Sequence, residues 1–236
     1  MERRTYRVSL AYDGAPFRGF SRQPGLPTVE LSLRDALTPI LGKPPRLAVA
    51  GRTDRGVHAL GQVISFCCFE DLDLARVAAA IDTAENEALF ALEVRKVGRS
   101  FHAQYSARAR HYVYLYEDDP ESLDARRIDQ LLCALQGRRC LTAFARDTPP
   151  GKSTVRTLRS ARARRTRHRG RSVVRFDFSA DSFLRHQVRI MVSTAVREAP
   201  HACPTDILCQ IAESQDRRAT APPAPPERLY LARVTY

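Results

Sequence analysis

The chain has 236 residues, of which 44% are apolar and 27% charged, as in folded globular proteins with a sizeable core. This composition excludes a largely disordered chain. The net charge is +12, and the segment from Arg146 to Arg175 holds 11 basic residues and one acid, Asp147. Such density predicts a polyanionic partner, and nucleic acid rather than membrane because no amphipathic apolar face accompanies it. A merely solvated arginine-rich hairpin is the alternative.

No apolar run is long enough to cross a bilayer, and the first residues lack the apolar region of a signal peptide. We therefore expect a cytoplasmic protein without membrane contact. The six cysteines form no C-x-x-C pair, so we expect reduced thiols rather than a metal site or a disulfide framework. These cysteines are Cys67, Cys68, Cys133, Cys140, Cys203 and Cys209.

The first part of the chain predicts the order β-α-β-β-α-β. Alternating apolar and polar residues indicate strands, and apolar residues at helical spacing indicate helices. The expected strands are 5–12, 46–50, 62–69 and 91–97; the expected helices are 29–41, capped by Thr28 and ended by Gly42, and 75–89.

The second part repeats this order with a hairpin near its middle. The expected strands are 111–117, 155–165, 171–180 and 228–236, with a turn at 168–170; the expected helices are 123–135, a helix from Ser182 to Val196 and a helix from Thr205 to Ala212. Helices interleaved with hairpin-connected strands predict an α+β fold with a mixed or antiparallel sheet and helices on one side. We expect two similar halves, 1–105 and 106–236, flanking a basic central cleft.

The sequence contains no G-x-G-x-x-G, P-loop, G-x-S-x-G or H-E-x-x-H motif, so nucleotide cofactors, serine hydrolysis and zinc peptidase chemistry lack support. The segment AGRTDRGVHALGQV, residues 50–63, stands out instead. It places three glycines, two arginines, Asp54 and His58 between two apolar strands, where a short turn would suffice. Asp54 fits either a functional carboxylate or an ordinary Asx-turn. His58 fits a surface turn better than a metal or acid–base pair with Asp54, because no third ligand is nearby.

The segment GRTDRGVHALGQV resembles the signature loop of tRNA pseudouridine synthases of the TruA type. Other segments resemble that family in the same order: AYDG and FRGFSRQP near the start, FHAQYSARARHYVYLY from Phe101, FLRHQVRIMV from Phe183, and APPAPPERLYLARVTY at the end. The resemblance spans essentially the whole chain. The chain departs from the family pattern at Phe20-Ser21, Glu30, Arg55 and Glu227-Arg228, and Arg55 adds a cation beside Asp54.

The resemblance implies a pseudouridine-synthase-like fold and an isomerase that converts uridine to pseudouridine in the anticodon stem-loop of tRNA. Asp54 is then the catalytic carboxylate, which either attacks C1′ of the ribose or removes a ribose proton. Arg189 is its implied counter-ion, and Arg185, one turn earlier on the same helix, is the alternative. The reaction conserves every atom of the uridine, so we expect no cofactor and no metal.

The remaining implied roles concern the RNA. Tyr112 matches a tyrosine that packs against the uracil, although Tyr112, Tyr114 and Tyr116 also fit one face of a packed strand. Arg52 resembles an arginine that takes the place of the displaced base, or else contacts a phosphate. The resemblance also implies a homodimer, and a tRNA-binding protein with little chemistry is the alternative function. The expected tRNA contacts are Phe101, His102, Ala103, Gln104 and Tyr105 by resemblance, and Arg162, Arg164, Arg165 and Arg167 by charge.

Overall fold

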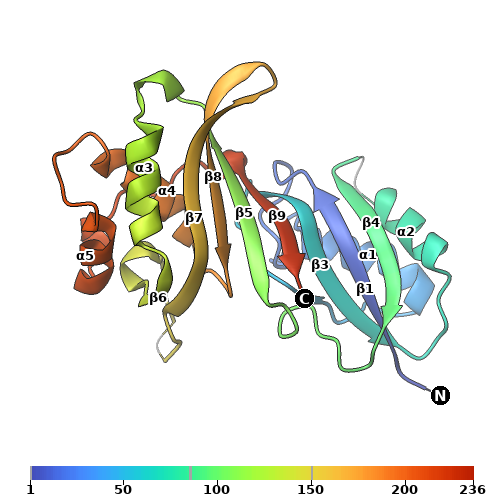
Figure 1. The fold of residues 1–236 in the computed structure, drawn as a ribbon. Helices are drawn as coiled ribbons and strands as arrows, with labels where there is room; N and C mark the ends of the chain where they lie inside the picture. The colour runs from blue at the N-terminus through green and yellow to red at the C-terminus, as the bar shows by residue number, and fades with distance from the viewer. Residues whose placement is uncertain (1, 85–86, 150) are drawn as a thin grey trace. The chain divides into compact units, whose positions relative to one another are not determined.

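The computed structural model describes residues 2–84, 87–149 and 151–236, which form two compact units (Figure 1). Unit 1 runs to Arg108 and includes Tyr230–Tyr236, and unit 2 is Ala109–Leu229. In this division the last strand groups with the first part of the chain.

Unit 1 is a mixed sheet covered by two helices. The strands lie in the order β4-β1-β3-β9, with β2 also paired to β3; β9 is parallel to β3, and the β1–β3, β1–β4 and β2–β3 pairs are antiparallel. Figure 1 shows α1 and α2 together on one side of these strands. The elements are β1 (Arg4–Tyr12), α1 (Val29–Leu41), β2 (Ala48–Val49), β3 (His58–Cys68), α2 (Leu74–Asp82), β4 (Leu89–Val97) and β9 (Leu229–Thr235).

Local sequence explains the first two elements of unit 1. In β1, alternate residues are buried on the helix side, among them Tyr6, Val8 and Leu10, each 0% exposed. The helix α1 begins where the Thr28 hydroxyl accepts a hydrogen bond from the Leu31 N–H at 3.3 Å. It ends at Gly42, whose φ of 69° suits glycine. Both predictions are confirmed.

Unit 2 is an antiparallel sheet in the order β5-β8-β7-β6. Its three α-helices lie on one side of these strands in Figure 1. Arg169 and Gly170 form the two-residue turn between β7 and β8, with φ values of 49° and 80°, which confirms the predicted hairpin. The elements are β5 (Ala109–Tyr116), α3 (Ala125–Ala134), β6 (Gly137–Cys140), β7 (Val155–His168), β8 (Arg171–Ala180), α4 (Gln187–Glu198) and α5 (Ile207–Ser214), with short 3-10 turns at Pro120–Ser122, Thr142–Phe144, Arg217–Ala219 and Pro226–Arg228.

Three predicted helix boundaries are wrong. Helix α2 ends at Asp82 rather than at residue 89, because Leu89 is fully buried as the first residue of β4, paired with Tyr12; residues 85–86 lie outside the described part. Ser182 does not cap α4, which begins at Gln187, whose side chain accepts the Leu184 N–H at 2.7 Å. Thr205 likewise does not cap α5, whose N-cap residue is Asp206.

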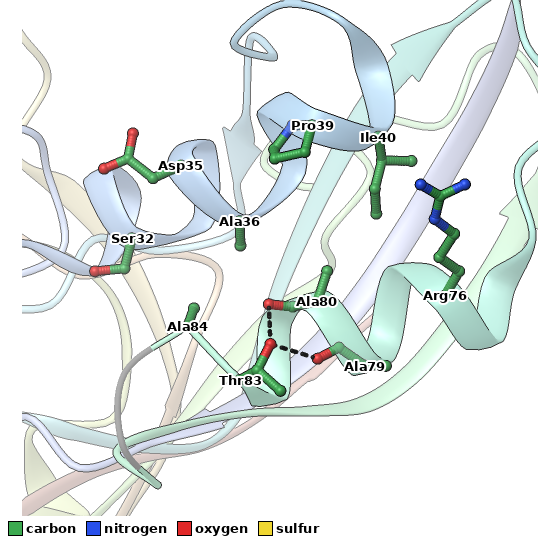
Figure 2. A pocket seen from close by; sticks show the side chains of 10 residues that line it. All are labelled: Ser32, Asp35, Ala36, Pro39, Ile40, Arg76, Ala79, Ala80, Thr83 and Ala84. Carbon is green, nitrogen blue, oxygen red and sulfur yellow. Dashed lines mark hydrogen bonds between the residues drawn. The ribbon is translucent and has the colours of Figure 1, made fainter.

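A groove of about 670 Å³ lies between α1 and α2 (Figure 2). Small side chains line it, including Ala36 on α1 and Ala79 and Ala80 on α2, and the Thr83 hydroxyl donates to the carbonyls of Ala79 and Ala80. The residues predicted for the functional site are not among those that line it. Within the described ranges, the structure has no helix that is long and apolar enough to cross a membrane.

Asp129 joins α3 to the outer edge of β7. Its carboxylate accepts hydrogen bonds from Arg162 at 2.9 and 3.0 Å and from the Ala163 N–H at 2.8 Å. Burial opposes ionisation of Asp129, but these bonds and the charge of Arg162 outweigh it, so the pKa lies below its ordinary value. The carboxylate therefore satisfies a strand N–H that would otherwise lie open at the edge.

Replacing Asp129 by Asn keeps the acceptor for the Ala163 N–H and removes the charge facing Arg162. We expect Asp129→Asn to lower the free energy of unfolding by ~1 kcal/mol at neutral pH. A lowered folded-state pKa stabilises the fold above the unfolded value, about 4, and this contribution disappears as the pH falls through the folded value. Denaturant titrations at several pH values should thus show the two proteins converging in acid. A difference in unfolding free energy between the two proteins that does not change with pH contradicts the coupling between Asp129 and Arg162. Fully additive effects of Asp129→Asn and Arg162→Gln in the double variant also contradict it.

Candidate active site

The loop that carries Asp54 connects β2 to β3 and is firmly seated at both ends. Ala50 and Val57 are 3% and 2% exposed, and Thr53 between them is 7% exposed. Asp54 is partly buried, whereas Arg52 and Arg55 are exposed. The backbone of the loop is thus held in the fold, and its one carboxylate lies between two exposed arginines in the sequence.

Side chains from β1 and β3 fix this loop by hydrogen bonds. The Tyr12 hydroxyl and the Thr53 hydroxyl share a hydrogen bond of 2.7 Å, and the Gln62 amide donates to the Gly51 carbonyl at 2.6 Å and to the Tyr12 hydroxyl at 3.3 Å. Burial raises the pKa of Tyr12 to about 12, against the effect of these hydrogen bonds. The phenol therefore stays neutral and keeps its proton for this network.

The segment between β1 and α1 lies directly on the same loop. A Cβ on Gly14 would stand 2.2 Å from the Val57 carbonyl oxygen, and one on Gly19 would stand 3.2 Å from the Thr53 carbonyl oxygen. The Phe20 N–H donates to that Thr53 oxygen at 3.0 Å. At Gly14 only glycine allows so close an approach of two backbones. At Gly19 a Cβ would make a tight contact that a small shift could relieve, and the φ of +102° also favours glycine there.

His58 has a structural role at the end of the loop. Its Nδ1 accepts the Gly14 N–H at 3.1 Å and lies 3.0 Å from an Asp13 carboxylate oxygen, and its ring stacks on Tyr230 with 4.9 Å between centroids. The histidine is therefore packed inside the loop rather than lying on a surface turn. Within the described ranges, no group of three or more His, Cys, Asp and Glu side chains could hold a metal ion.

The segment 101–105 lies beside the base of the Asp54 loop in unit 1. Ala50, Val63 and Ala103 form one buried cluster, against which Phe101 and Tyr236 pack. The expected tRNA-contacting segment and the Asp54 loop thus share a common foundation.

Two of the remaining predicted site residues lie in unit 2. Tyr112 on β5 is 7% exposed and meets the Phe183 ring edge-on at 5.1 Å. Arg189 on α4 is partly buried, and its Nε donates to the Ala224 carbonyl at 2.6 Å, which fixes the plane of the guanidinium. Arg185 is exposed and donates to Asp147 at 3.0 Å. The surroundings of Arg189 suit an oriented, partly desolvated cation better than those of Arg185.

The arginines of β7 differ in what they contact. Arg162 is paired with Asp129, and Arg165 lies 2.7 Å from Glu121 and donates to the Leu123 carbonyl. Arg164 lies only within 4.0 Å of Asp177, whose carboxylate already receives two nitrogens of Arg175. Arg167 is exposed further along β7. Carboxylates thus compensate Arg162 and Arg165 more fully than Arg164.

Four residues that hold the Asp54 loop are not among the candidate site residues predicted from the sequence: Tyr12, Gly14, Gly19 and Gln62. Three of them lie in the AYDG and FRGF segments, and Gln62 lies in the loop segment itself. Their family-like sequence was the signal that could have found them.

Comparison with known proteins decides the family. A family described as tRNA pseudouridine synthase matches residues 132–236. The chain is 32% identical over 246 residues to tRNA pseudouridine synthase A of Streptococcus sanguinis, covering 98% of both chains. It is 35% identical over 248 residues to tRNA pseudouridine synthase A of Caulobacter vibrioides, again covering 98% of both. The chain belongs to the tRNA pseudouridine synthase A family.

Several departures from the family pattern have a structural account. Phe20, 1% exposed, fills the space beneath the loop, and its carbonyl accepts the Glu30 N–H at 2.9 Å. The Glu30 carboxylate in turn accepts the Arg22 N–H at 2.9 Å. Arg228 pairs with Asp118 at 3.2 Å and with Glu117 at 3.6 Å. These changes are thus built into local contacts, whereas Arg55 is an exposed addition to the loop.

The close approach at Gly19 can be tested with a matched glycine from the same segment. Gly25 has a φ of +68° and open space around it, so Gly25→Ala adds only the cost of the backbone conformation. Gly19→Ala adds a contact with the Asp54 loop as well. We expect Gly19→Ala to lower the free energy of unfolding by ~1 kcal/mol more than Gly25→Ala, as measured in denaturant. Equal losses for the two variants contradict a tight contact at Gly19.

Proposed function

We propose that the protein is a tRNA pseudouridine synthase in which Asp54 is the catalytic carboxylate. The observation that carries the proposal is a partly buried carboxylate on a loop clamped by Tyr12, Gln62 and two close-packed glycines. Similarity over nearly the whole chain to proteins named tRNA pseudouridine synthase A supports it.

The proposed reaction breaks the bond between N1 and C1′ of uridine, turns the uracil and joins C5 to C1′. The proton on C5 leaves and one is gained at N1, so the composition of the nucleotide is unchanged. No redox step or group transfer is involved, which is why we propose that neither cofactor nor metal takes part. The Asp54 carboxylate either attacks C1′ or removes a ribose proton, and both routes need it ionised.

Three further residues complete the proposed machinery. Arg189 serves as the counter-ion of the Asp54 carboxylate, and the fixed plane of its guanidinium supports this role. Tyr112 packs against the turned uracil, and its contact with Phe183 holds its ring in place. Arg52, exposed beside Asp54, occupies the space that the uracil leaves. In this proposal the half 1–105 carries Asp54 and Arg52, and the half 106–236 carries Tyr112 and Arg189.

We also propose the setting of the reaction. The substrate is the anticodon stem-loop of tRNA, the enzyme acts as a homodimer, and the location is the cytoplasm. A net charge of +12 supports a phosphate-rich substrate.

Release of tritium from tRNA labelled at C5 of uracil tests whether the protein makes pseudouridine. The variant Asp54→Asn tests whether Asp54 is the catalytic carboxylate. We expect tritium release by the wild type and a loss of at least about 1,000-fold for Asp54→Asn, because the amide cannot act as a nucleophile or base. Affinity for tRNA should stay within a few fold. Asp35→Asn, on α1 at the groove of Figure 2, is the control and should keep full activity. A wild type that binds tRNA without releasing tritium points instead to a tRNA-binding protein with little chemistry.

The arginines of β7 give a second prediction. An arginine that is not already paired with a carboxylate can neutralise an RNA phosphate and so release the counter-ions bound there. We expect replacement of Arg164 and Arg167 by Gln to weaken tRNA binding and to reduce the salt slope of log affinity by about one to two units. Replacement of Arg162 and Arg165 by Gln should alter that slope less and reduce stability more, since both contact protein groups. Filter binding at several salt concentrations measures both. If neither pair changes binding at low salt, the RNA path does not follow β7.

A further inference from the structure

Tyr105 is the most exposed of the large apolar side chains in the described part of the chain. It is 80% exposed, against 58% for Leu60, the next in order. Its ring stacks on the imidazole of His102, with 4.3 Å between centroids and 23° between planes. One face of the Tyr105 ring is therefore covered by His102, and the large exposure leaves the other face open.

The turn beneath this aromatic pair is fixed by buried contacts. Ala103, 0% exposed, donates its N–H to the Ser65 hydroxyl at 3.0 Å, and its carbonyl accepts the Tyr236 hydroxyl at 2.9 Å. Phe101 packs against the Tyr236 ring with 4.9 Å between centroids. The backbone on which Tyr105 stands is thus part of the core of unit 1 rather than a loose loop.

His102 is fixed as well. Its Nδ1 accepts the N–H groups of Gln104 and Tyr105 at 3.2 and 3.3 Å, and its own backbone exchanges hydrogen bonds with Ser106 at 3.0 and 2.9 Å. These bonds hold the imidazole plane beneath the Tyr105 ring. The stack therefore exists before any ligand binds, and little conformational entropy is lost when the open face is covered.

The chemistry of the pair favours a nucleic acid as the ligand. Of the cations nearby in the sequence, Arg95, Lys96 and Arg99 are paired with Glu93, Asp71 and Glu2, and Arg108 is exposed. The preference therefore rests on the open, rigid aromatic face, which matches the sites on which proteins stack unpaired bases. An apolar protein partner would instead call for a wider apolar patch around Tyr105.

We propose that Tyr105, backed by His102, is a stacking platform for one unpaired base of the tRNA. The proposal rests on the proposed function, since it takes tRNA as the ligand. It assigns a contact with a base rather than with a phosphate. The base continues the stack as its third member and the Tyr105 hydroxyl makes no essential contact. This platform positions the substrate and does not take part in the chemistry at C1′.

Alanine and phenylalanine replacements separate stacking from other roles of Tyr105. We expect Tyr105→Ala to weaken tRNA binding about 5- to 100-fold, with KM raised and kcat little changed, whereas Tyr105→Phe should bind as the wild type does. The salt slope should be the same for all three proteins, because stacking releases no counter-ions. Phe69→Ala removes another exposed ring of unit 1, 48% exposed, and should leave binding unchanged. Wild-type affinity in Tyr105→Ala, or a reduced salt slope, overturns the platform.

Fluorescence gives a direct readout, because the sequence contains no tryptophan. Tyr105→Trp introduces a single indole at the platform, and Phe69→Trp introduces one at the control position. We expect tRNA to quench the first strongly and the second little, and unequal quenching of this kind supports stacking. Equal or absent quenching overturns it. A Tyr105→Ala protein that changes its oligomeric state in sedimentation also overturns it, since Tyr105 is then a subunit contact.

These measurements distinguish the platform from the proposed function. If the wild type makes pseudouridine but the Tyr105 variants bind tRNA normally, the platform alone is wrong. If the Tyr105 variants lose affinity as expected but the wild type makes no pseudouridine, the proposed function is wrong and the platform stands.

Discussion

The arrangement around Asp54 depends on two backbones that pack tightly and, at Gly14, lie closer together than any side chain permits. The β1–α1 segment rests on the Asp54 loop at Gly14 and Gly19, where a Cβ would meet carbonyl groups of Val57 and Thr53. The loop cannot shift toward β1 without a clash, and the hydrogen bond between Tyr12 and Thr53 prevents a shift away from it. A carboxylate on such a loop is oriented before substrate arrives, so binding energy is not needed to organise it.

Arginine serves two different purposes in this chain. Arg162 is held by Asp129 in the middle of α3, and Arg165 by Glu121 in the 3-10 turn before α3. Exposed pairs of this kind add little stability, but the Asp129 carboxylate also satisfies a strand N–H, which gives the contact a structural reason. Arg164, by contrast, shares an acid that Arg175 already occupies. A polyanion can therefore use the charge of Arg164 more readily than that of Arg162 or Arg165.

Elements that depend on local sequence could be predicted, and contacts between distant residues could not. The alternation in β1, the Thr28 cap and the Arg169-Gly170 turn are local signals, and each element was predicted correctly. The end of α2 was not, because burial of Leu89 against β1 overrides an apolar pattern that continues past Asp82. Asp54 stood out by its position between strands. Tyr12 contacts Thr53 in the loop across 41 residues and Gln62 across 50, and no local pattern reveals either pair.

Hydrogen exchange of the free protein tests most directly whether the Asp54 loop is organised in advance. The Val57 N–H donates to the Asp54 carbonyl at 3.1 Å, and the Phe20 N–H donates to Thr53 at 3.0 Å. We expect both amides to exchange slowly without tRNA, at rates close to those of buried amides in β1 and β3, and tRNA to change these rates little. Rapid exchange in the free protein, with protection only after tRNA is added, would show instead that the substrate organises the loop.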